Sequence, residues 1–107
     1  MNISRIDDRF SVSPQIDPAD IPEIKRLGFS GIVCARPDGE DAGQPSFAAI
    51  AHAAEAAGLK AVHIPVSGQC TEAQLIRFQE AMADMPGPVL GYCRSGGRAG
   101  TLYRSTR

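Results

Sequence analysis

The residues most suited to chemistry lie together in one stretch, Cys93-Arg94-Ser95-Gly96-Gly97-Arg98. A cysteine reacts as its thiolate, and nearby positive charge lowers the pKa of the thiol. Arg94 and Arg98 supply such charge, and the Ser95 hydroxyl can donate or accept a proton at the sulfur. The stretch therefore predicts a nucleophilic Cys93 beside a bound anion.

The surroundings of this stretch favour the same interpretation. It follows an apolar run at residues 89–92 that predicts a buried strand, and residues 99–103 can begin a helix. Unpaired amides at a helix start bind anions, and Gly96 and Gly97 let the backbone turn with no side chain in the way. The alternative is a buried structural cysteine followed by an ordinary exposed turn.

Length and composition indicate one globular domain. The chain has 107 residues, 43% of them hydrophobic and 21% charged, so we expect a single domain over residues 1–107. The last helix has little room, which leaves truncation at the C-terminus as an alternative. The net charge of −1 argues against a nucleic-acid or membrane partner. From residue 94 onward there are four arginines and no acidic residue, which suits a small anionic substrate.

The termini and the cysteines suggest where the protein works. Residues 1–10 are polar and charged, so no signal peptide is expected. The three cysteines have neither disulfide-framework nor metal-site spacing. We expect a cytoplasmic protein that uses no metal and no cofactor, and the sequence leaves its oligomeric state open.

Strand and helix patterns alternate along the chain. The patterns predict strands at residues 10–14 (an edge strand), 31–35, 60–66 and 89–93. Helices are expected at residues 17–27, with Leu27 on the inward face, and from about residue 97. A cap at Ser46 predicts a helix over residues 46–57, and a capping box at Thr71 predicts one over residues 71–85. The fold class is therefore α/β, a short and mostly parallel sheet of about four strands with helices on both faces.

In such sheets ligands bind where the parallel strands end. Three loops are expected to meet there, at residues 36–40, 67–70 and 93–98. Arg36 either helps to orient an anion or is a surface turn residue. Cys34 is expected in the core, His52 on the surface, and His63 in a structural role.

The loops also carry a family resemblance. The segments Arg36-Pro37-Asp38-Gly39-Glu40, His63-Ile64-Pro65-Val66 and Tyr92 to Arg98 resemble the phosphatase-like domain family of beta-lactamase-hydrolase-like proteins, over residues 1–103. The resemblance implies a fold like that of dual-specificity phosphatases, with members described as phosphatase-like hydrolases or sulfurtransferases. It also implies a nucleophilic Cys93 and an anion-binding Arg98.

Two features distinguish the candidate reactions. The signature of tyrosine phosphatases has five residues between its cysteine and its arginine, whereas only four separate Cys93 from Arg98. In this spacing the loop resembles the active site of rhodanese. Phosphate ester cleavage also needs a proton for the departing oxygen. The 67–70 loop has no carboxylate, so Asp38 is the nearest substitute.

We therefore expect a thiolate enzyme that transfers sulfane sulfur from a donor such as thiosulfate through a Cys93 persulfide. The alternative is a phosphatase-like hydrolase that forms a phosphocysteine, with Arg98 on the phosphate and Asp38 as the acid. A second alternative is a non-catalytic anion-binding module. In each case Arg94, Ser95, Gly96, Gly97 and Arg36 are the expected anion contacts.

Overall fold

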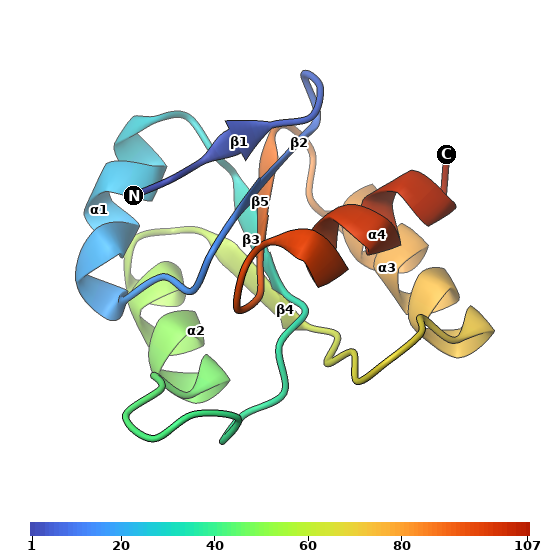
Figure 1. Ribbon diagram of the computed structural model, residues 1–107. Coiled ribbons are helices and arrows are strands. Elements are labelled where there is room, and N and C mark those ends of the chain that lie inside the picture. The colour runs from blue at the N-terminus through green and yellow to red at the C-terminus, as the bar shows by residue number, and fades with distance from the viewer.

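A sheet lies between two helical layers in the computed structural model, which describes residues 1–107 (Figure 1). Helices α1 and α2 cover one face, and α3 and α4 cover the other. The strands are β1 (Ser4–Arg5), β2 (Phe10–Ser13), β3 (Gly31–Cys34), β4 (Lys60–His63) and β5 (Val89–Tyr92). The helices are α1 (Ile21–Arg26), α2 (Phe47–Ala56), α3 (Glu72–Asp84) and α4 (Gly97–Ser105), with a 3-10 turn, η1, at Pro18–Asp20.

The sheet confirms the predicted fold class and adds one strand. Its order is β1-β2-β5-β3-β4, and every pairing is parallel except that of β1 with β2. The prediction that β2 lies at the edge was wrong, because the two-residue β1 covers its outer side. β2, β3, β4 and β5 therefore all end at one edge of the sheet, called here the carboxyl edge.

Local capping chemistry sets where the helices begin. Thr71 and Asp17 each form a capping box, and the Ser46 hydroxyl accepts the amide of Ala49. The helix expected over residues 17–27 is instead η1 followed by α1. Leu27, expected to face inward, is 53% exposed because the helix ends at Arg26 and the side chain leaves the buried face.

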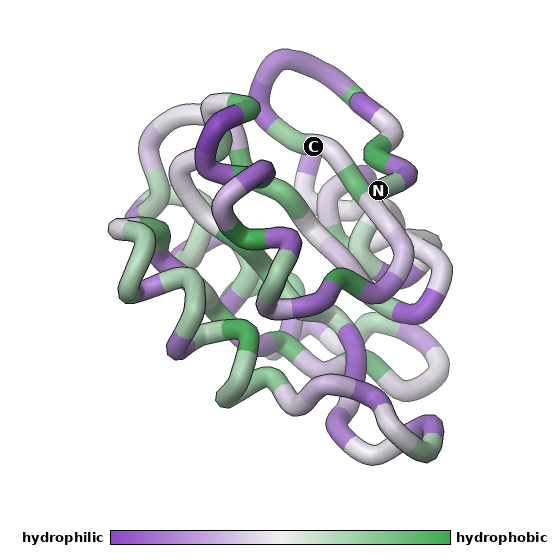
Figure 2. Tube along the Cα trace, turned by 90° about the vertical axis from the view of Figure 1, so that its left-hand side faces the viewer, coloured by the Kyte–Doolittle hydropathy of each residue, from purple (hydrophilic) through white to green (hydrophobic).

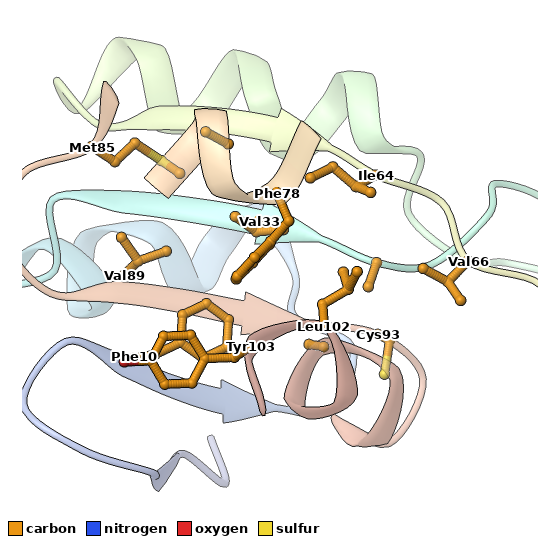
Figure 3. Packing of buried hydrophobic residues seen from close by; sticks show 13 residues of the cluster. Phe10, Val33, Ile64, Val66, Phe78, Met85, Val89, Cys93, Leu102 and Tyr103 are labelled. Carbon is orange, nitrogen blue, oxygen red and sulfur yellow. The ribbon is translucent and has the colours of Figure 1, made fainter. Parts of the chain in front are cut away.

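Each face of the sheet has its own apolar core. Figure 3 shows the α3/α4 side, where Phe10 and Tyr103 stack at 4.6 Å between ring centroids and Cys93 lies at the end of the cluster beside α4. The other cluster packs α1 and α2 on β3 and β5, and it contains Cys34 and Tyr92. Since successive strand residues point to opposite faces, Tyr92 and Cys93 lie on different sides of the sheet.

In Figure 2 hydrophilic and hydrophobic residues alternate along the helical coils, as expected for helices with one face on a sheet. At the carboxyl edge the loops include residues 36–46 after β3 and 93–96 after β5. None of the helices has both the length and the apolar character that a bilayer-spanning segment requires.

Candidate active site

Cys93 directly follows strand β5 and lies at the carboxyl edge of the sheet. The strand residues Val89 to Tyr92 are all buried between β2 and β3, so the position of the next residue is fixed by the sheet. Cys93 is itself fully buried, at the floor of the Cys93 loop (residues 93–98). Gly97 then begins α4, as predicted, and α4 packs on the sheet through Ala99 and Leu102.

Gly96 makes the turn between strand and helix. Its φ of +97° lies in the left-handed region, which L side chains rarely adopt. A Cβ at this position would lie 3.3 Å from the carbonyl oxygen of Ser13. Glycine at residue 96 is therefore required both by the backbone conformation and by the close approach of β2.

The turn directs backbone amides at the sulfur. The Gly96 N–H donates to Cys93 Sγ at 3.0 Å. Burial is the largest single influence on the thiol and raises its pKa, but the amides of Ala99, Ser95, Arg98 and Gly96 together lower the pKa of Cys93 below its ordinary value. The shortened spacing of the loop thus still gives a cup of amides that favours a thiolate.

Arg98 lies beside this cup and is partly engaged by protein oxygens. Its Nη1 and Nη2 donate to the two carboxylate oxygens of Glu40, both at 2.8 Å, and Nη1 also donates to the Val66 carbonyl at 2.9 Å. Glu40 above all raises the pKa of Arg98, and a Cys93 thiolate raises it further. The guanidinium is therefore close to the sulfur and fully charged.

Arg36 has a different role from the one expected. It was predicted to contact an anion or to lie on a surface turn, but its side chain is only 3% exposed. Its nitrogens donate to Glu40, Gln15 and Asp41, at 2.9, 2.9 and 2.6 Å. Because all three nitrogens have protein acceptors, Arg36 acts on the site through Glu40 rather than by direct contact.

The other rim residues are held more loosely. Arg94 is 70% exposed and pairs with Asp41 at 3.4 Å, and its carbonyl accepts the Gln15 amide. Ser95 is exposed, and its hydroxyl accepts the Gly97 amide at 3.3 Å, so it supports the first turn of α4. The structure therefore brings together two of the predicted loops, residues 36–40 and 93–98.

Asp38 is not joined to the Cys93 loop by any hydrogen bond or ion pair. Its Oδ1 accepts the Phe47 amide at 2.8 Å, which ties it to the beginning of α2. The 67–70 loop contributes no charged group. Cys93 is thus surrounded by N–H donors, whereas the Asp38 carboxylate is bonded to the start of α2.

The contacts of His63, Cys34 and Cys70 indicate structural roles. His63 Nε2 bonds the Arg36 carbonyl at 2.8 Å, and its ring stacks on Phe47. Cys34 is buried as predicted, and burial raises the pKa of its thiol. Cys70 is half-buried at the entry to α3, and burial raises its pKa too. Cys93 is thus the one cysteine whose surroundings lower its thiol pKa.

Three residues at the site escaped the sequence analysis: Gln15, Glu40 and Asp41. Glu40 and Asp41 follow a Pro-Asp-Gly turn, which is typical of solvated surface loops. The signal available was the spacing of Arg36 and Glu40, four positions apart. The partner that gives Glu40 its importance, Arg98, lies 58 positions further along the chain.

Comparison with known proteins identifies the family of this chain. The family described as "Beta-lactamase hydrolase-like protein, phosphatase-like domain" matches residues 2–106. The beta-lactamase hydrolase-like protein of Agrobacterium fabrum is 45% identical over 96% of this chain, and that of Xylella fastidiosa is 40% identical over the same share. The chain spans 24% of the length of each of these relatives.

A solved structure is similar over nearly the whole chain. It is a candidate phosphatase from Neisseria meningitidis, which is 36% identical and superposes with a TM-score of 0.86. The match covers 96% of this chain and 74% of the Neisseria protein. The similarity confirms the α/β phosphatase-like fold.

Proposed function

This chain belongs to the phosphatase-like domain family of beta-lactamase hydrolase-like proteins, and on that premise we propose that it hydrolyses small phosphate esters through a phosphocysteine on Cys93. The observation that carries the proposal is the amide cup, which lowers the pKa of a buried thiol, together with the arginine beside it. A phosphoryl group presents negative oxygens that such donors stabilise.

The comparisons change the order of the two reactions considered from the sequence. Sulfur transfer was expected first, because only four residues separate Cys93 from Arg98 and because no acid follows the third predicted strand. The relatives support the phosphatase alternative instead. The short loop is compatible with it, since four amides still act on the sulfur.

In the proposed reaction the Cys93 thiolate attacks phosphorus while the loop amides and Arg98 hold the phosphoryl oxygens. An S–P bond forms, and the P–O ester bond breaks with its electron pair on the departing oxygen. Water then forms a new P–O bond, the S–P bond breaks, and the products are inorganic phosphate and the thiolate. Gly96 and Gly97 leave space for the substrate, while Arg94 and Ser95 lie at the rim.

The proposed role of Asp38 as acid is weakened by its place at the start of α2. We therefore propose that the enzyme prefers leaving groups that depart without a proton, such as aryl oxides. If Asp38 were the acid, its replacement by asparagine would cost about 10²–10⁴ in kcat. We expect D38N to lose less than about tenfold even on an alkyl phosphate, whose leaving oxygen does need a proton.

Two assays on the purified chain test the proposal. One measures phosphate release from p-nitrophenyl phosphate, and the other measures thiocyanate from thiosulfate and cyanide, each with C93S as the control. We expect phosphate release that C93S abolishes, and an intact mass that gains one phosphoryl group during turnover. Thiocyanate formation without phosphate release would overturn the proposal in favour of a persulfide.

A further inference from the structure

One carboxylate connects the nucleophile's loop to the loop after β3. Oε1 of Glu40 accepts from Arg36 Nε at 2.9 Å and from Arg98 Nη2 at 2.8 Å, and its Oε2 accepts from Arg98 Nη1. The Glu40 side chain is 30% exposed and that of Arg98 is 25% exposed. The two arginines, above all Arg98, hold the pKa of Glu40 at about 2, so it is ionised at every working pH.

The geometry of these bonds leaves a defined part of Arg98 for a ligand. A guanidinium has five N–H groups in one plane. Glu40 takes one hydrogen of Nη1 and one of Nη2 across the end of the group, and the Val66 carbonyl takes the other hydrogen of Nη1. The Nε hydrogen and the second Nη2 hydrogen bond no oxygen of the protein, and the guanidinium lies close enough to Cys93 to interact with its sulfur. These two hydrogens lie along one edge and form a fork that matches two oxygens of a phosphate.

We propose that Glu40 is a positioning residue, which fixes the plane of Arg98 so that its free Nε–Nη2 edge faces a phosphoryl group on Cys93. This inference rests on the proposed function. Glu40 contacts the arginine from the end opposite its stem, so it orients the guanidinium without taking the edge that the phosphate needs.

The carboxylate is itself held rigidly, as a positioning group must be. Its anchor, Arg36, is buried and bonded to Gln15 and Asp41 as well. The Gln44 side chain closes the loop, because its Oε1 accepts the amides of Glu40 and Asp41 and its Nε2 donates to the Pro37 carbonyl. Arg98 is thus oriented by a chain of bonds that ends in the core.

A competing role for Glu40 predicts a change of phosphate binding in the opposite direction. If Glu40 merely occupied Arg98 as an internal anion, removing its charge would release the arginine and tighten phosphate binding. If Glu40 positions Arg98, removing the charge frees the guanidinium to rotate and weakens binding. The direction of the change in E40Q therefore distinguishes the two roles.

The matched control is E23Q. Glu23 lies on α1, away from the Cys93 loop, and both of its carboxylate oxygens accept from Arg26, as those of Glu40 accept from Arg98. We would measure the inhibition constant of inorganic phosphate, kcat and KM for p-nitrophenyl phosphate, and the thermal midpoint, for the wild-type chain, E40Q, E40D and E23Q. We expect E40Q to weaken phosphate binding and to lower kcat/KM by at least about tenfold, the loss typical of one charged hydrogen bond.

E23Q makes the same chemical change in an exposed ion pair outside the site, so it should change phosphate binding by less than about threefold. E40D keeps the charge on a shorter stem that cannot reach both arginines, so it should give an intermediate loss, and it serves if E40Q does not fold. Phosphate binding in E40Q or E40D as tight as in the wild type overturns the assignment and leaves the proposed function intact. A wild-type chain that neither binds phosphate nor cleaves the ester overturns both.

Discussion

Replacing Gly96 with alanine tests the geometry of the site at the point where sequence and structure constrain it most. The residue has φ of +97°, and an added Cβ would lie 3.3 Å from the Ser13 carbonyl oxygen and 3.4 Å from its carbon. Both atoms belong to the backbone of β2, an inner strand, so they cannot easily move away.

The expected cost follows from these two constraints. An L residue in the left-handed conformation costs about 1–2 kcal/mol, and the close contact adds strain, so we expect G96A to lower the free energy of unfolding by about 1–3 kcal/mol. Against a typical stability of about 5–15 kcal/mol the variant should still fold.

G96A should also raise the pKa of the Cys93 thiol. Relief of the strain moves the residue 96 amide away from Cys93 Sγ, which it now approaches at 3.0 Å. A hydrogen bond to a charged group contributes about 1.5–3 kcal/mol, and 1.36 kcal/mol corresponds to one pKa unit. We therefore expect the thiol pKa to rise by about one to two units.

Urea unfolding and the pH dependence of Cys93 alkylation by iodoacetamide measure the two effects. G97A is the matched control, because Gly97 has no positive φ and an added Cβ would meet only the Ser95 hydroxyl, at 3.4 Å. Alanine there should be neutral or stabilise α4 by up to about 1 kcal/mol. If G96A and G97A had the same stability and the same thiol pKa, the assignment of the amide cup would be refuted.

Three further results are expected. The pKa of Glu40 is lowered from 4.5 to about 2. The stability that Glu40 contributes is therefore present above about pH 4.5 and is lost as the pH falls towards 2. Urea midpoints measured across that range should fall more steeply for the wild type than for E40Q. Y92F removes a buried hydroxyl that has no hydrogen-bond partner, so the free energy of unfolding measured in urea should stay the same or increase. In G91A the new Cβ would clash with the ring of Phe10, so calorimetry should show destabilisation by about 1–3 kcal/mol.

The features that the sequence predicted well depend on neighbouring residues. The Thr71 capping box and the Ser46 cap lie within a few positions of their partners, and both are formed. The strand–loop–helix arrangement around Cys93 was likewise predicted from adjacent residues, and the alternation of elements identified the fold class.

The features that were missed depend on contacts between distant segments. β1 has only two residues and exists because it pairs with β2. The importance of Glu40 depends on Arg98, and the burial of Arg36 depends on Gln15 from another loop. Leu27 fits the helical period, but the helix ends before it. None of these follows from a local pattern.

The contact between Tyr103 and the first strands has a consequence for assembly of the protein. The Tyr103 hydroxyl donates to Asp7 at 2.7 Å, across 96 positions of chain, and its ring stacks on Phe10. The helix that shapes the anion loop is therefore anchored to the opposite end of the sequence. The contact cannot form on a nascent chain until residue 103 has been synthesised, so α4 and the turn that it continues from Cys93 can pack in their final positions only after both ends of the described fold are present.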